Sequence, residues 1–251
     1  MVGITASLLT RRPRVTAFVA VSAGVVAWFL VAPHLGRIGL WPAILLVSIA
    51  IIPGTLLLVL IALPLWDRRW LFIAVIVLAL IALVCTIADF GLAANFAKLW
   101  AAVFAGWAFL VLFERLSWVV LVAFVIPLVD IISVWKGPTH TITQHHFGVY
   151  TAVAIAFLVP GGGAAYLGPP DILFYALFLA AASRWNLRVG WTWFATTFMY
   201  GLTVIIATLA DVNGLPALPF LSFGFLVANA DLLWRAMRPS VDSSESSPAS
   251  S

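Results

Sequence analysis

Long apolar runs, each able to form a helix that crosses a bilayer, follow one another along most of the chain. A spanning helix needs about 20 mostly apolar residues. Hydrophobic residues make up 64% of the 251 residues and charged residues only 9%, whereas soluble domains carry about 25% charged residues. The chain has too little polar surface for a soluble fold, so we expect an all-α polytopic membrane protein.

Eight apolar runs predict eight transmembrane helices. The first, beginning at Val15, exceeds the core of a typical signal peptide and lacks a convincing cleavage site, so we expect it to be retained as a span. Pro53 predicts a bend in the second. The predicted spans cover about residues 15–33, 41–64, 70–88, 95–113, 117–135, 167–184, 190–210 and 216–235.

The basic residues predict the orientation of these spans. With eight spans and a cytoplasmic N-terminus, ten of the thirteen Lys and Arg residues fall on the inner side, and only Arg37, Lys98 and Lys136 fall outside. This distribution follows the positive-inside rule and places both termini in the cytoplasm. The basic residues lie in short connections and form no patch, so the net charge of +4 does not indicate a nucleic-acid partner.

The spans divide the chain into four regions. An outer loop, residues 136–166, contains an apolar stretch that is too short for a comfortable span, and we expect this stretch to be re-entrant or interfacial. The C-terminal tail is polar and rich in serine, which predicts disorder. The regions are a cytoplasmic segment (1–14), an N-terminal four-helix membrane region (15–113), a second membrane region that includes the outer loop (114–238) and the cytoplasmic tail (239–251).

Two aspartates, Asp130 and Asp171, lie inside apolar runs. An ionised carboxylate in hydrocarbon is costly, so such residues usually face the interior of a bundle and mark function. Asp130 lies shortly before the outer end of its predicted span and Asp171 shortly after the outer end of the next. At 1.5 Å per helical residue, both lie about 6–8 Å below the outer boundary. The pair could approach closely, share one proton and activate a water molecule between them.

Position alone leaves other roles open for these aspartates. Paired carboxylates in membranes also form proton relays or cation sites in transporters. One of them could simply cap a helix, because Pro169 and Pro170 ahead of Asp171 suit the first turn of a helix.

Three segments together resemble the presenilin and signal peptide peptidase family of intramembrane aspartyl proteases, in the manner of a divergent prokaryotic-type member. The first resembles the helix that carries the family's YD motif, the second the helix opened by its GxGD motif, and the third contains its PAL motif. The segments are VDIISVWKGPTHTI (129–142), LGPPDILFYALFLAAASRW (167–185) and GLPALPFL (214–221). The resemblance implies a presenilin-like helical bundle, with about eight spans here where the family usually has nine.

The resemblance also implies an intramembrane aspartyl endopeptidase that needs no metal or organic cofactor. Asp130 and Asp171 would form the catalytic dyad. Gly168 would be the first glycine of GxGD, and the PAL residues would border the site and position the substrate. The implied site residues are Asp130, Asp171, Gly168, Pro216, Ala217 and Leu218.

Two positions depart from the family pattern. Val129 replaces the tyrosine of YD, and Pro170 replaces the glycine just before the second aspartate. Glycine allows backbone conformations closed to other residues, whereas proline fixes φ and lacks an N–H group. This leaves two alternatives: a weak or inactive homologue that binds membrane helices, and a proton-coupled transporter that uses the same carboxylates.

The predicted orientation resembles that of the signal peptide peptidases. It implies an integral protein of a prokaryotic plasma membrane whose partners are the lipid bilayer and transmembrane-helix substrates, including signal peptides and type II-like proteins. Oligomeric state is left open.

Local patterns add three expectations outside the aspartate pair. His140, His145 and His146 lack a specific ligand spacing and are expected to be solvated rather than to bind metal. Asp231 is expected to pair with Arg235 one turn later. Small residues such as Gly106 are expected to allow close helix packing.

Overall fold

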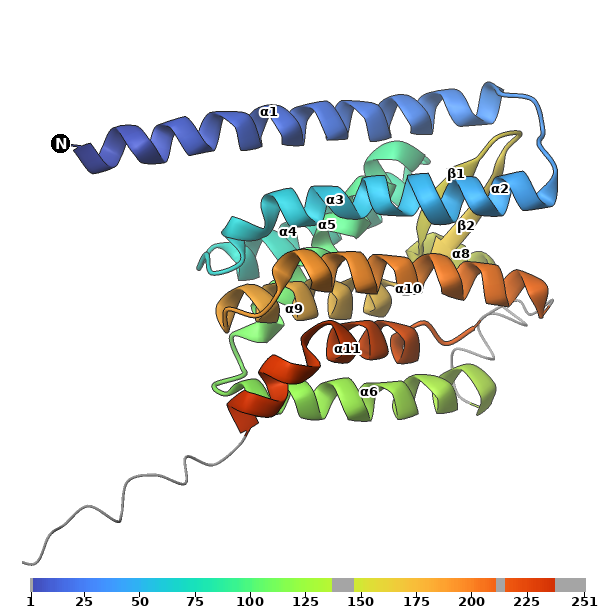
Figure 1. Cartoon of the computed structure of the whole chain (residues 1–251). Helices are drawn as coiled ribbons and strands as arrows, with labels where there is room; N and C mark the ends of the chain where they lie inside the picture. Colours follow the sequence, from blue (N-terminus) through green and yellow to red (C-terminus); the bar gives the residue numbers. More distant parts are fainter. Residues whose placement is uncertain (1, 137–146, 211–214, 238–251) are drawn as a thin grey trace, which may run out of the picture.

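The computed structural model describes residues 2–136, 147–210 and 215–237, which form a bundle of helices with one small hairpin (Figure 1). The helices are α1 (Val2–Val31), α2 (Leu40–Leu46), α3 (Ile52–Ala62), α4 (Leu71–Ile87), α5 (Gly91–Leu110), α6 (Leu116–Lys136), α8 (Phe147–Val153), α9 (Pro169–Arg184), α10 (Val189–Leu209) and α11 (Leu218–Met237). Short 3₁₀ turns follow α1 (η1, Ala32–His34) and α3 (η3, Leu63–Leu65), and a π-helical turn (η2, Val47–Ile51) joins α2 to α3.

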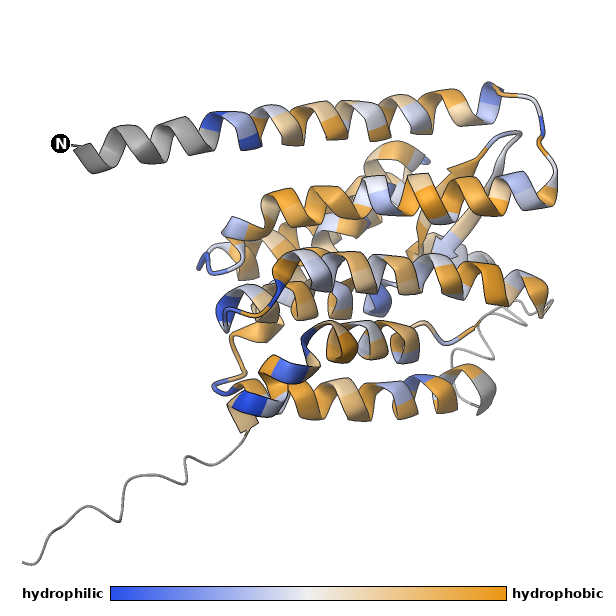
Figure 2. Ribbon diagram, in the orientation of Figure 1, coloured by the Kyte–Doolittle hydropathy of each residue, from blue (hydrophilic) through white to orange (hydrophobic). Residues whose placement is uncertain are grey.

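A helical segment lies at each of the eight predicted spans. Five segments of the described chain are long and apolar enough to cross a membrane: Arg12–His34, Leu40–Leu65, Gly91–Leu110, Leu116–Val134 and Val189–Leu209. Of the other three, α4 has 17 residues and α9 has 16, while α11 carries polar residues in its second half. Hydrophobic residues predominate along the helices (Figure 2) and many large apolar side chains are exposed, which is compatible with a membrane environment.

Two of these segments differ from their predicted form. The helix α1 begins at Val2, so helix extends through the segment expected to precede the first span. In the second segment the irregularity is the π-helical turn Val47–Ile51, which lies just before Pro53. Proline lacks the N–H group that would bond to the preceding turn, and its ring crowds that turn, so the helix widens locally.

Helix α9 is the most deeply buried element described. Every residue from Tyr175 to Ala182 is fully inaccessible, whereas α4 exposes large side chains such as Ile73 and Leu80. Close packing of α5 on α9 depends on Gly106, because a Cβ atom there would collide with the backbone oxygen of Leu173. The expected role of Gly106 in close helix packing is confirmed, and it fixes the helix that carries Asp171.

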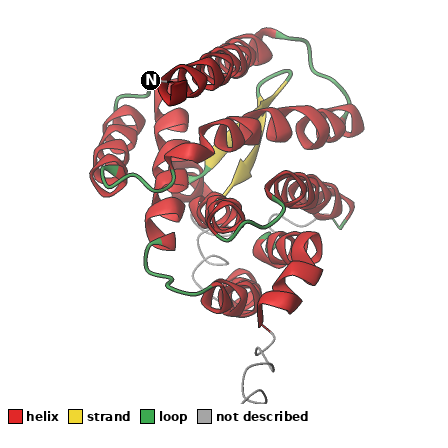
Figure 3. Ribbon diagram, turned by 60° about the vertical axis from the view of Figure 1, so that its left-hand side comes forward, coloured by secondary structure: helices red, strands yellow, loops and turns green. Residues whose placement is uncertain are grey.

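A two-stranded antiparallel hairpin precedes α9, where a re-entrant or interfacial segment was expected (Figure 3). Strand β1 (Ile155–Val159) pairs with β2 (Gly163–Leu167), and the pair Val159–Gly163 closes the hairpin. The turn contains Gly161 and Gly162 at φ +85° and +88°, a conformation that glycine adopts without steric cost. The apolar stretch therefore supplies a short helix and a strand.

Three contacts hold the hairpin against the bundle. The side-chain amide of Asn95 in α5 accepts a hydrogen bond from the Ala156 N–H (2.7 Å) and donates one to the Ala156 carbonyl (3.0 Å). The Trp28 indole donates to the Leu158 carbonyl at 2.9 Å. At the tip, the Gly161 N–H donates to the Ala32 carbonyl at 3.2 Å. Helices α1 and α5 therefore fix the strand pair that leads into α9.

The predicted ion pair between Asp231 and Arg235 is wrong. Arg188, which lies directly before α10, donates two hydrogen bonds to the Asp231 carboxylate at 2.7 and 2.8 Å. The Arg188 N–H also donates to the side-chain oxygen of Asn229 at 3.0 Å. Packing of α10 on α11 brings Arg188 beside Asp231. The planar guanidinium group then donates two parallel hydrogen bonds to the carboxylate.

Candidate active site

Asp130 lies on α6 and contacts the first residue of α11. The Leu218 N–H donates a hydrogen bond to the Asp130 carboxylate, with 3.0 Å between nitrogen and Oδ2. The first N–H groups of a helix lack partners within the helix, and a carboxylate is a favourable acceptor for them. Pro216 and Ala217 are buried just before Leu218. The PAL segment therefore lies against the first aspartate.

Asp171 lies in the first turn of α9, after Gly168 at the N-cap position and Pro169 and Pro170 in the first two helical positions. Its Oδ2 atom accepts a hydrogen bond from the Gly168 N–H at 3.0 Å. Proline is well suited to this part of a helix because its missing N–H would have no partner within the helix. Pro170 thus fits the local backbone, and Asp171 also has the capping role that the sequence left open.

The two aspartates lie on packed helices at the same end of the bundle. Hydrogen bonds join Leu218 to Asp130 and Gly168 to Asp171, and Pro216 and Ala217 lie directly beside Leu218. The helices that carry the two aspartates, α6 and α9, are in contact, and Asp130 lies within electrostatic range of Asp171.

Two tyrosines that the sequence analysis did not single out, Tyr150 and Tyr200, lie near the aspartates. Tyr150 of α8 lies near Asp171, and burial together with the charge of that carboxylate raises the pKa of Tyr150 to about 12. Its phenol therefore keeps its proton at physiological pH. Tyr175 and Tyr200 are fully buried, with ring centroids 5.8 Å apart. No motif in the sequence indicates these residues, which lie on three different helices, α8, α9 and α10.

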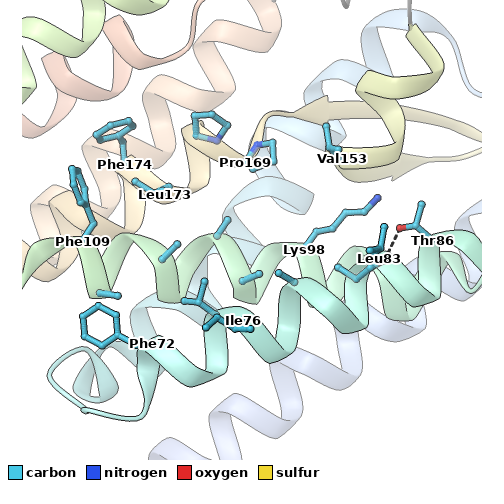
Figure 4. Close-up of a pocket in the computed structure, with 18 of the residues that line it drawn as sticks. Phe72, Ile76, Leu83, Thr86, Lys98, Phe109, Val153, Pro169, Leu173 and Phe174 are labelled. Carbon is cyan, nitrogen blue, oxygen red and sulfur yellow. Dashed lines mark hydrogen bonds between the residues drawn. The ribbon is translucent and has the colours of Figure 1, made fainter.

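A large apolar groove runs along α4 and α5 to the first turn of α9 (Figure 4). Its volume is about 1100 Å³, and its lining includes Lys98, Pro169, Pro170 and Phe174. Alanines of α4 and α5 form much of its floor. Neither Asp130 nor Asp171 belongs to its lining, so this groove differs from the polar, outward-opening cavity that hydrolysis at the aspartates requires.

His140, His145 and His146 lie outside the described residues. Among the residues that are described, no group of three His, Cys, Asp or Glu side chains could hold a metal ion.

The comparisons with known proteins add no family assignment. A scan against protein-family models, a search of curated proteins and a search of solved structures each found no match to this chain.

Proposed function

We propose that the chain is an intramembrane aspartyl endopeptidase that cleaves transmembrane helices with Asp130 and Asp171. The observation that carries the proposal is the hydrogen bond from the Leu218 N–H to Asp130. It joins the PAL segment to the first aspartate, and the second aspartate lies within electrostatic range on α9. The proximity of these three segments, which are far apart in the sequence, supports the proposal. We further propose that the protein is integral to a prokaryotic plasma membrane, with both termini cytoplasmic.

The proposed chemistry uses one ionised and one protonated carboxylate. The ionised aspartate takes a proton from water as the water oxygen bonds to the peptide carbonyl carbon, and the protonated aspartate donates its proton to the carbonyl oxygen. The aspartate that took the proton from water then donates it to the amide nitrogen as the C–N bond breaks, and the other aspartate, now ionised, takes a proton from a hydroxyl of the tetrahedral intermediate. This leaves a carboxylic acid and an amine as products and restores one ionised and one protonated aspartate. Either aspartate can take either role.

The substrate must unwind before this reaction, because a membrane helix holds its peptide groups in its own hydrogen bonds. Pairing with an existing sheet edge would hold an unwound segment. The outer edge of β1 is occupied, since Asn95 bonds to Ala156 and Trp28 bonds to Leu158. We therefore propose that the substrate strand adds along β2.

The direction of the backbone N–H and C=O groups along β2 supports this placement. The backbone groups of Ala156 and Leu158 point away from β2, toward Asn95 and Trp28. In an antiparallel pair, the residue opposite such a residue also points its backbone groups away from the partner strand. Ala164, which lies opposite Leu158, therefore points its backbone groups away from β1. This alternation continues to Gly168, whose N–H already contacts Asp171. A strand added to β2 would therefore run to the second aspartate.

Leu218 provides the experiment that tests the proposal. The purified protein in liposomes is expected to cleave a reporter with a type II-like transmembrane helix. Leu218→Pro is expected to lower cleavage at least about tenfold relative to Leu218→Ala, because proline removes the N–H that bonds to Asp130. Position 218 is the first residue of α11, where proline is tolerated, so the backbone should remain folded.

The Leu218→Ala variant is the matched control, because it also loses the side chain but keeps the N–H. Equal cleavage by the proline and alanine variants would show that activity does not depend on the hydrogen bond between Leu218 and Asp130. No cleavage by the wild-type protein would contradict the protease proposal itself.

A second candidate is a non-catalytic protein that binds membrane helices. It is favoured by the hydrogen bond from the Gly168 N–H to Asp171, because this bond gives the second carboxylate a structural role that requires no catalysis. This candidate predicts a wild-type protein that binds reporter helices in liposomes and leaves them intact.

A further inference from the structure

Tyr200 of α10 has a buried hydroxyl group without a hydrogen-bond partner in the described part of the chain. Its side chain is fully inaccessible, and its oxygen is one of four buried side-chain N or O atoms left unpaired there. Burying an unpaired hydroxyl lowers stability, so such a group calls for an explanation that folding does not supply.

The surroundings of Tyr200 point to the aspartates. Both Asp171 and Asp130 lie within electrostatic range of its hydroxyl, yet it bonds to neither carboxylate. The ring of Tyr200 packs on Tyr175 with 5.8 Å between centroids, and Tyr175 lies one helical turn after Asp171 on α9. Tyr200 therefore lies beside the part of α9 that carries the second aspartate.

Neighbouring residues hold Tyr200 in this position. Its ring packs on Tyr175, whose own hydroxyl already pairs with the Thr197 hydroxyl at 3.2 Å. The next residue, Gly201, lies so close to η2 that a Cβ atom there would be 2.9 Å from the Ser48 backbone oxygen. Helix α10 is thus fixed on both sides of the tyrosine, and its hydroxyl is preorganised.

We infer that the Tyr200 hydroxyl donates a hydrogen bond to the carbonyl oxygen of the scissile peptide as that oxygen becomes part of the tetrahedral intermediate. This inference rests on the proposed protease function. The tyrosine keeps its proton throughout, because the protonated aspartate supplies the proton that the oxygen gains. A preorganised donor in a water-poor site stabilises developing charge without reorganisation, which makes Tyr200 a catalytic residue.

Tyr200→Phe tests the inference, because it removes the hydroxyl and keeps the ring. The rate constant kcat for cleavage of the reporter in liposomes is expected to fall about 100-fold, the effect of losing one oxyanion donor, while KM stays within about twofold. The thermal unfolding temperature is expected to stay the same or rise, since the variant no longer buries an unpaired polar group. A merely structural tyrosine would not combine lower activity with unchanged or higher stability.

Tyr175→Phe is the matched control, since it removes a neighbouring buried hydroxyl that is already paired with Thr197. Its kcat is expected to stay within about threefold of the wild-type value, because the lost hydroxyl is bonded to Thr197. A Tyr200→Phe protein with wild-type kcat, or with a lowered unfolding temperature, would overturn the role of Tyr200 and leave the protease proposal standing. A wild-type protein that does not cleave the reporter would overturn both.

Discussion

Replacing Asp130 or Asp171 with asparagine is expected to abolish cleavage of a helical reporter, by about 10⁴-fold or more, while the protein stays folded. Removing one member of a catalytic group that acts as a unit has effects of this size. Asparagine keeps an acceptor oxygen for the N–H groups of Leu218 and Gly168, which bond to these carboxylates at 3.0 Å. It loses the ability to exchange a proton, so the substitutions separate chemistry from helix capping.

The measurement is the initial rate of reporter cleavage in liposomes, with thermal unfolding of each variant in parallel. Asp89→Asn is the matched control, because Asp89 lies in the turn between α4 and α5 with φ of 57°, a conformation that asparagine tolerates well. The control is expected to cleave like the wild-type protein. Substantial cleavage by Asp171→Asn would show that Asp171 caps α9 and takes no part in catalysis.

Gly106→Ala is expected to have the largest effect on stability, because it acts where α5 packs on the buried helix α9. The added Cβ atom would collide with the Leu173 backbone oxygen and lie 3.1 Å from the Ala176 Cβ atom. Overpacking of this kind costs about 1–3 kcal/mol and occasionally more. The collision involves backbone, so relief requires α9 to shift, and Asp171 shifts with it. Cleavage is therefore expected to fall together with the unfolding temperature.

Gly54→Ala provides the comparison in another helix. A Cβ atom at position 54 in α3 would meet nothing within 4 Å, so this variant is expected to be neutral or slightly stabilising, in line with the higher helix propensity of alanine. Thermal unfolding of both variants in the same detergent measures the difference. Equal unfolding temperatures would contradict a close contact between α5 and α9 at Gly106.

The helix positions could be predicted from sequence because they depend on the length of apolar runs. Runs of about 20 apolar residues place the helices. Counting residues from the span ends predicts a common depth for Asp130 and Asp171, and the helices that carry them are in contact.

The hairpin before α9 was missed because its strands are short and apolar on both sides. The segments Ile155–Val159 and Gly163–Leu167 have five residues each, and periodicity alone does not separate such runs from helix. The glycines between them were the available signal, since two positive φ angles in a row suit a tight turn.

Tertiary contacts explain the remaining differences. The partner of Asp231 is Arg188, which lies on another segment and cannot be found by a rule for residues on one helix. The environment of Tyr200 likewise depends on the meeting of α6, α9 and α10, and a lone tyrosine in an apolar run carries no motif.

An experimental structure with a bound peptide isostere, whose hydroxyl mimics the tetrahedral intermediate, would test the joint action of Asp130 and Asp171 most directly. We predict that this hydroxyl lies within hydrogen-bonding distance, about 2.5–3.0 Å, of a carboxylate oxygen of each aspartate. An isostere bound elsewhere, or one that contacts a single aspartate while the other faces away, would contradict the account.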